Sequence, residues 1–128
     1  MVVSNQRGIA RGLVNERTLT QIEEEIQSGL APHDVRIAAF RYCPHELGEG
    51  CDCRKPKPGL ILDLARELQI DLASSWMIGD SASDVEAGRA AGTRTALIAA
   101  DGKGDADLAA PTLLDVAAAI GAQADSAA

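Results

Sequence analysis

Aromatic residues are almost absent from this sequence. The 128 residues include one Trp, one Tyr and one Phe, or 2% of the chain, although 46% of the residues are hydrophobic. We therefore expect a core of Ala, Val, Leu and Ile, and the length suffices for one domain with a modest core. No apolar run approaches the roughly 18–20 residues that span a membrane. The N-terminus reaches polar residues at Ser4, so a signal peptide is not expected.

Cysteine and positive charge are also scarce. Three cysteines cannot all pair within one chain, so we expect no disulfide framework and a reducing, cytoplasmic setting. The chain has 12 basic and 19 acidic residues, and its net charge of -7 argues against nucleic acid as the main partner. Several basic residues nevertheless lie in the first half of the chain, which favours a small anionic ligand: Arg7, Arg11, Arg41, Arg54, Lys55 and Lys57.

Short β-branched or apolar runs alternate with helical patterns along the chain. Strands are expected at residues 2–4, 35–42, 75–79 and 95–99, and helices at 18–30, 58–69, 81–92 and 112–120. Thr18 and Gln21 are spaced as a capping box, and Ser81 or Ser83 is expected to cap the third helix. The alternation predicts an α/β fold with a parallel sheet. We expect one domain, residues 1–122, followed by a frayed tail, residues 123–128.

One loop holds all three cysteines and one of the two histidines. Cys43, His45, Cys51 and Cys53 have a Cys3His composition and a spacing typical of a closed, structural zinc site. The alternative is a set of reduced thiols beside an unrelated histidine, but the Gly, Glu, Asp and Pro around them are not the apolar surroundings of an ordinary buried cysteine. A redox sensor that uses Cys51 and Cys53 is a further, weaker interpretation.

Three other places have residues that suit phosphate chemistry. Asp80 follows the strand expected at 75–79, at the edge where open α/β sheets bind ligands, and a carboxylate there suits Mg²⁺. A helix N-cap is an equally good interpretation of Asp80. Asp84 is better explained as a favourable charge in the first turn of a helix. The Ser4-Asn5 pair could donate to phosphate oxygens or form a turn. The basic pair that follows the cysteines could face a ligand or solvent.

Together these segments resemble the haloacid-dehalogenase (HAD) phosphatase superfamily. Residues 2–12 resemble its second motif, residues 53–56 its third and residues 78–84 its fourth. The cysteine loop narrows the resemblance to the branch that contains D-glycero-D-manno-heptose 1,7-bisphosphate 7-phosphatase and histidinol-phosphatase. The resemblance implies a Rossmann-like parallel sheet and Mg²⁺-dependent hydrolysis of a phosphorylated sugar through an aspartyl-phosphate. It also implies a monomer that binds neither nucleic acid nor membrane.

The resemblance also implies roles for individual residues. Lys55 would neutralise charge on the phosphoryl oxygens, and Asp80 would bind Mg²⁺. Ser81 stands where the heptose enzymes often have Lys. The residues expected to bind substrate are Ser4, Asn5, Gln6, Arg7, Arg54, Lys55 and Ser81.

The Asp-x-Asp-Gly motif that opens the catalytic domain of this superfamily has no counterpart in the sequence. Asp105-Ala-Asp107 matches only the Asp-x-Asp part in letters, and no strand is expected to run into this pair. We therefore expect the central first strand to be absent and the remaining strands to form two pairs. We also expect these 128 residues alone to be inactive. A zinc-stapled, non-catalytic phosphate-binding fragment is the alternative to an enzyme.

Overall fold

The computed structural model describes residues 1–5, 15–43, 51 and 55–127. The chain divides into two compact units, Met1–Arg54 and Lys55–Ala128, which are described separately. The sequence has no linker that marks this boundary. Among the described residues, no helix is both long and apolar enough to cross a membrane.

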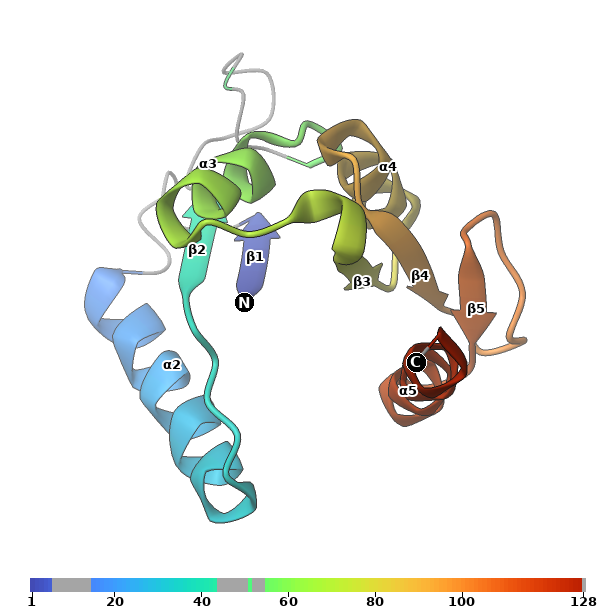
Figure 1. Ribbon diagram of the computed structural model, residues 1–128. Coiled ribbons are helices and arrows are strands. Elements are labelled where there is room, and N and C mark those ends of the chain that lie inside the picture. Colours follow the sequence, from blue (N-terminus) through green and yellow to red (C-terminus); the bar gives the residue numbers. More distant parts are fainter. Residues whose placement is uncertain (6–14, 44–50, 52–54, 128) are drawn as a thin grey trace. The chain divides into compact units, whose positions relative to one another are not determined.

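The described residues of the first unit form two parallel strands and one long helix (Figure 1). Strand β1, Val2–Asn5, pairs in parallel with β2, Phe40–Cys43. Helix α2, Glu16–Leu30, and a short 3-10 helix, η1, Ala31–His33, lie between the two strands in sequence. This order of elements gives the parallel connection that the sequence predicts.

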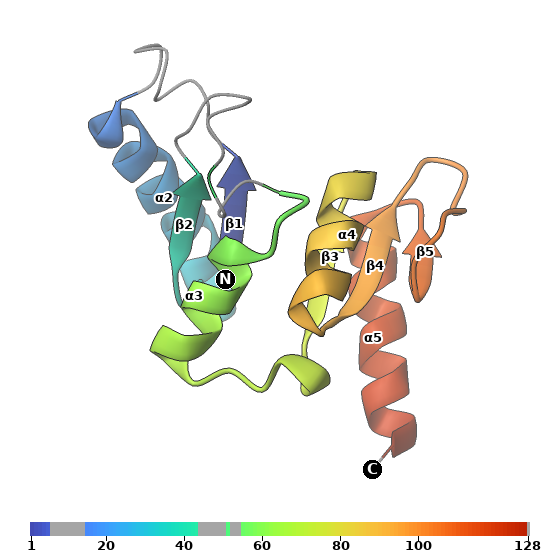
Figure 2. The same ribbon diagram turned by 90° about the horizontal axis from the view of Figure 1, so that it is seen from above.

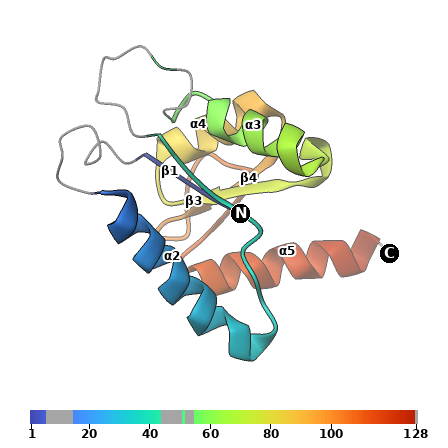
Figure 3. The same cartoon turned by 90° about the vertical axis from the view of Figure 1, so that its left-hand side faces the viewer.

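Strand β2 is shorter than the strand expected at residues 35–42. The segment before it runs back along α2 (Figures 1 and 3). There the side-chain amide of Gln27 donates to the carbonyl oxygen of Ile37 at 2.8 Å and accepts from its N–H at 2.9 Å. The Gln27 side chain thus satisfies the backbone N–H and C=O of Ile37, which are then not available to a neighbouring strand. The segment from Val35 is therefore a return path between α2 and β2 and not part of the strand.

Helix α2 begins earlier than the capping box predicts. Its N-cap is Asn15, whose side-chain oxygen accepts from the N–H of Thr18 at 2.8 Å and from its hydroxyl at 3.0 Å. The expected Thr18–Gln21 capping box is therefore wrong, because Thr18 is already in the first turn. Asn and Thr are both good capping residues, so the sequence left two starting points within three positions.

The second unit is a three-stranded parallel sheet with helices (Figures 1 and 2). The strand order is β3-β4-β5, with Gly79 of β3 level with Leu97 of β4. Helix α4 packs on β3 and β4, and α5 packs on β4 and β5. The elements in chain order are α3, Gly59–Leu68; η2, Leu72–Ser74; β3, Trp76–Gly79; α4, Ala82–Ala91; β4, Arg94–Ile98; β5, Leu108–Ala110; and α5, Leu113–Ala127.

Small and aliphatic side chains build the core of this unit, as the scarcity of aromatic residues predicts. Helix α4 approaches β3 closely at Gly88, where a Cβ atom would overlap the Cβ of Met77. The buried apolar side chains of the unit are Leu60, Ile61, Leu64, Ala65, Val85, Ala87, Ala91, Ala96 and Val116.

The predicted α/β class with parallel strands is confirmed, with two differences in detail. The described strands form two separate sheets, but one has three strands instead of two because β5 was not expected. With only three residues, Leu108–Ala110 is too short to show a strand pattern. Helix α5 continues to Ala127, so the segment expected to fray from residue 123 is helical there.

Candidate functional site

The carboxyl end of β3 leads directly into the N-terminus of α4. Gly79 is the last residue of the strand, and Ser81 is the N-cap of the helix, with its hydroxyl oxygen 3.4 Å from the N–H of Asp84. Of the two serines expected as caps, the structure selects Ser81. The N-cap alternative for Asp80 is therefore wrong, and the exposed Asp80 side chain lies between the strand and the cap.

Asp84 lies in the first turn of α4, and its carboxylate accepts several hydrogen bonds. It is only 5% exposed. One carboxylate oxygen, Oδ2, accepts from the N–H of Asp80 at 3.2 Å and from the hydroxyl of Ser81 at 2.9 Å. The other, Oδ1, accepts from Nζ of Lys55 at 2.5 Å. The carboxylate thus connects the end of β3 and the first turn of α4 to Lys55, four residues before α3 begins.

The ionisation of Asp84 follows from these contacts. Burial raises the pKa of a carboxyl group, but the hydrogen bonds from Lys55 and Ser81, the charge of Lys55 and the N–H of Asp80 together hold the pKa of Asp84 below its usual value. Asp84 is therefore a carboxylate at neutral pH, and it fixes the Lys55 ammonium group close to the carboxyl end of β3.

Sequence reasoning assigned Asp84 only a helix-dipole role and missed its contact with Lys55. The local signal was the Ser81-x-x-Asp84 spacing, in which an acidic side chain at the third helical position reaches back to the preceding backbone. No local pattern connects positions 55 and 84. Gly79 is part of the same arrangement, since a Cβ atom there would overlap the Asp84 side chain.

The first unit places Ser4 and Asn5 at the carboxyl end of β1, as the sequence predicts. Ser4 is level with Tyr42 on β2, and Asn5 is level with Cys43. Successive strand side chains point to opposite faces, so the side chains of Ser4 and Asn5 do not share a face. The expected ligands Gln6, Arg7 and Arg54 lie outside the described residues.

Two of the four expected zinc ligands lie side by side in this unit. Cys43, at the end of β2, is completely buried, and its Sγ is 3.4 Å from Sγ of Cys51. This distance is too long for a disulfide of about 2.05 Å. It is close to the separation of about 3.8 Å between two thiolates on one tetrahedral zinc. His45 and Cys53 lie outside the described residues. Among the described residues, no group of three or more His, Cys, Asp or Glu side chains is arranged to bind a metal ion.

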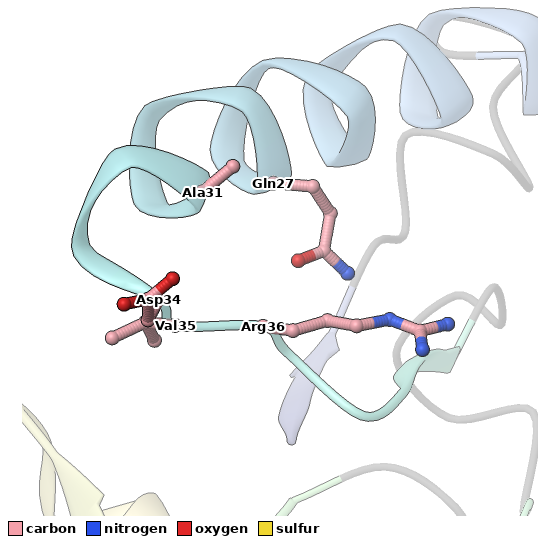
Figure 4. A pocket seen from close by; sticks show the side chains of 5 residues that line it. All are labelled: Gln27, Ala31, Asp34, Val35 and Arg36. Atoms are coloured by element: carbon pink, nitrogen blue, oxygen red, sulfur yellow. The ribbon is translucent and has the colours of Figure 1, made fainter.

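A hollow of about 470 Å³ lies elsewhere in the first unit (Figure 4). It lies between the end of α2 and the start of the return path, and the side chains of Gln27 and Arg36 extend along it (Figure 4). The residues that line it are Gln27, Ala31, Asp34, Val35 and Arg36, none of which belongs to the motifs. The hollow is therefore not the candidate site.

The Asp105/Asp107 pair lies away from the carboxyl end of β3. Asp105 is exposed and pairs with Arg89 in the last turn of α4. Asp107 accepts from the N–H of Thr95 at 2.8 Å and from its hydroxyl at 3.2 Å. Thr95 is level with Met77, so Asp107 lies about 10 Å before Asp80 along the strand direction. Asp107 therefore fastens the start of β5 to β4, and Asp105 fastens the segment before β5 to α4. Neither carboxylate reaches Asp80.

The second unit is thus an α/β protein whose sheet carries, at one carboxyl edge, an exposed carboxylate above a buried lysine–carboxylate pair. A family model described as HAD-hydrolase-like matches residues 52–122, more than half of the chain. The chain belongs to this family of HAD-like hydrolases, as the three motif segments predict.

Several curated relatives share one activity in their names. The D-glycero-beta-D-manno-heptose-1,7-bisphosphate 7-phosphatase of Photorhabdus laumondii is 40% identical over 110 residues, which are 80% of this chain and 58% of that protein. The enzyme of the same name from Pseudomonas putida is 41% identical over 107 residues, 84% of this chain and 61% of that protein. The chain therefore spans about three fifths of the length of these relatives.

A solved structure shares the fold. It is the crystal structure of D,D-heptose 1,7-bisphosphate phosphatase from B. bronchiseptica complexed with magnesium and phosphate. The TM-score is 0.70 at 40% sequence identity, and the match covers 75% of this chain and 54% of the other. The parallel α/β elements described above therefore have the arrangement of a HAD-like phosphatase.

Proposed function

We propose that this chain is the phosphate-handling part of a Mg²⁺-dependent phosphatase. Its substrate is a sugar bisphosphate, and the bond broken is the 7-phosphate ester of D-glycero-D-manno-heptose 1,7-bisphosphate. The observation that carries the proposal is the Lys55–Asp84 pair at the carboxyl end of β3. Exposed Asp80 is the first residue after this strand. The names of the 40%-identical relatives support the choice of substrate.

In this proposal Lys55 stabilises negative charge on the transferring phosphoryl group. Asp84 does not touch the substrate but holds the lysine in place. A fixed cation of this kind acts without reorganisation when charge develops, which is the usual source of electrostatic catalysis. The ion pair therefore positions Lys55 for catalysis in addition to stabilising the fold.

Asp80 is the proposed Mg²⁺ ligand. Its carboxylate is a hard oxygen donor, it is exposed, and it lies at a strand edge, which fits an ion that uses few protein oxygens plus water and phosphate. The ion would supply further neutralisation of phosphoryl charge. The residues proposed to contact substrate are Ser4, Asn5, Gln6, Arg7, Arg54 and Ser81. The Ser81 hydroxyl already donates a hydrogen bond to Asp84. Ser81 would therefore support the site through the helix N-cap as well as through contact with substrate.

A chimera tests this proposal. Residues of this chain would replace the matched region of the P. laumondii relative, and phosphate release would be measured with heptose bisphosphate and Mg²⁺. We expect activity, and we expect Asp80→Asn and Lys55→Met each to lower kcat by roughly 10²–10³-fold. Asp63→Asn, on an exposed part of α3, is the matched control and should leave kcat unchanged. A chimera that prefers histidinol phosphate would replace the proposed substrate, and an Asp80→Asn chimera with full Mg²⁺-dependent activity would exclude the metal role.

We also propose that Cys43, His45, Cys51 and Cys53 bind one structural zinc in a reducing, cytoplasmic setting. The support is the 3.4 Å separation of the Cys43 and Cys51 sulfurs. Elemental analysis of reduced protein should find about one zinc per chain, and Cys51→Ser should lose it. His33→Ala is the control, because this exposed histidine lies apart from the cysteine loop in sequence. Reduced protein without metal would rule the zinc out.

A further inference from the structure

A chain of hydrogen bonds links three polar side chains at the start of α4. The Ser81 hydroxyl is 2.9 Å from Oδ2 of Asp84, and it is also 2.9 Å from the hydroxyl of Ser83. Ser83 is half-buried, and sequence reasoning considered it only as a helix cap. All three residues belong to the second unit, so the chain of hydrogen bonds forms within one compact part of the protein.

The positions of the hydrogens follow from the partners of Asp84. Nζ of Lys55 donates to Oδ1 and the N–H of Asp80 donates to Oδ2, so both carboxylate oxygens are acceptors. The Ser81 hydroxyl has one hydrogen, which is therefore directed to Asp84. The contact between the two serines then uses the hydrogen of Ser83. The Ser83 oxygen thus offers lone pairs, but no hydrogen, to a ligand.

We propose that Ser83 is a specificity-determining residue that accepts a hydrogen bond from a hydroxyl group of the substrate. The inference rests on the proposed function, because it concerns the sugar part of the same substrate. A sugar hydroxyl can donate to the Ser83 oxygen, whereas a phosphate dianion can only accept and finds no donor there. Ser83 therefore selects a phosphate ester that carries a hydroxyl group.

The two ends of the hydrogen-bond chain have opposite polarity. At one end Lys55 is a cation and a donor, which suits the acceptor oxygens of phosphate. At the other end Ser83 is an acceptor, which suits a hydroxyl. A phosphorylated sugar has both kinds of group close together. The site should therefore bind a phosphorylated sugar more tightly than a phosphate ester without hydroxyl groups.

Equilibrium binding to the full chain tests this inference, since we expect the 128 residues to bind substrate without turnover. NMR titrations with Mg²⁺ at about pH 8, where phosphate esters are dianions, would compare heptose bisphosphate with methyl phosphate, which has no hydroxyl. We expect Ser83→Ala to weaken heptose bisphosphate binding by about 3–10-fold, as for one lost hydrogen bond, and to leave methyl phosphate binding unchanged. Ser83→Thr keeps the acceptor oxygen and should bind both ligands as the parent does.

Ser74→Ala is the matched control. The Ser74 hydroxyl also donates to an aspartate, Asp71, at 2.7 Å, but it lies in η2, before β3 begins. Its loss should change the affinity for neither ligand.

Three results would overturn the inference. Equal weakening of both ligands by Ser83→Ala would show that the hydroxyl acts on the phosphate or only supports the fold. Unchanged binding of heptose bisphosphate would show that the contact does not exist. A loss with histidinol phosphate but not with heptose bisphosphate would show that the donor is an ammonium group. The chimera tests the proposed function separately: an inactive chimera rejects the phosphatase, whereas the binding comparison decides the Ser83 contact.

Discussion

Lys55 and Asp84, 29 positions apart, form an ion pair with Nζ 2.5 Å from Oδ1 and side chains only 14% and 8% exposed. Another ion pair of the second unit, Asp63–Arg66 on α3, has side chains 69% and 78% exposed. Solvent screens the exposed pair almost completely, whereas either charge of the buried pair is costly without its partner. This difference makes Lys55–Asp84 a testable determinant of both stability and site geometry.

Removal of one partner should destabilise the second unit more than removal of both. We expect Asp84→Ala to lower the free energy of unfolding by about 3–5 kcal/mol, because it removes the carboxylate that pairs with the largely buried Lys55 ammonium group. The double variant Lys55→Met/Asp84→Ala should recover part of this loss. Urea unfolding followed by the fluorescence of Trp76, the single tryptophan, measures both values.

Asp63→Asn is the matched control for this cycle, since it removes a carboxylate from an exposed pair. It should change the free energy of unfolding by less than about 0.5 kcal/mol. Strictly additive effects of the Lys55 and Asp84 substitutions would show that the pair does not act as a unit.

The stability of the second unit should fall in acid because of Asp84. The pKa of Asp84 is lower in the folded protein than its usual value, against burial that would raise it. Its contribution is therefore fully present above the unfolded pKa of about 3.9 and is lost as the pH falls through the folded pKa. Trp76-monitored unfolding between about pH 5 and pH 2 should show this loss, and Asp84→Asn should remove it.

Salt separates this effect from that of the exposed Asp105, whose pKa is also lowered by Arg89. At about 1 M salt, where charges are screened beyond about 3 Å, the Asp105 contribution should vanish and most of the Asp84 contribution should remain. A pH dependence that is the same in the parent and in Asp84→Asn would contradict the assignment.

Two glycines of the second unit should respond to alanine in opposite directions. A Cβ atom at Gly79 would overlap Asp84, so Gly79→Ala should destabilise by about 1–3 kcal/mol and disturb the Lys55 contact. Gly121 lies in α5 with nothing within 4 Å of such an atom, so Gly121→Ala should stabilise by about 0.5–1 kcal/mol. The denaturation midpoints of the two variants give the sign of each change when their m-values equal that of the parent. A neutral Gly79→Ala would show that the strand end can shift.

The 128 residues alone should release no phosphate above background from heptose bisphosphate, histidinol phosphate or p-nitrophenyl phosphate. An aspartyl-phosphate route needs a nucleophilic carboxylate and a second carboxylate as acid and base. Asp84 is bonded to Lys55, and Asp107 is bonded to Thr95 at the other end of the sheet. A Mg²⁺-dependent activity that Asp105→Asn or Asp107→Asn abolishes would show that this pair supplies the nucleophile.

The sequence alone determined the parallel α/β class and most element positions. Alternation of apolar runs with helical patterns is a local signal, and the structure places β3, β4, α3 and α4 within one or two residues of expectation. The motif segments were also enough to indicate the HAD-like family. The sequence failed where local signals compete or are too short, as at the start of α2, the return path before β2 and the three-residue β5.

Only the tertiary structure decided which side chains meet. Nothing local relates Lys55 to Asp84, because the contact depends on how α3 and α4 pack and on the absence of a side chain at Gly79. The contact between the sulfurs of Cys43 and Cys51 likewise joins residues eight positions apart. Residue type and spacing can be read from the sequence, but burial and side-chain contacts arise only when distant segments pack. The sequence thus fixes which groups are available, and packing fixes what each one does.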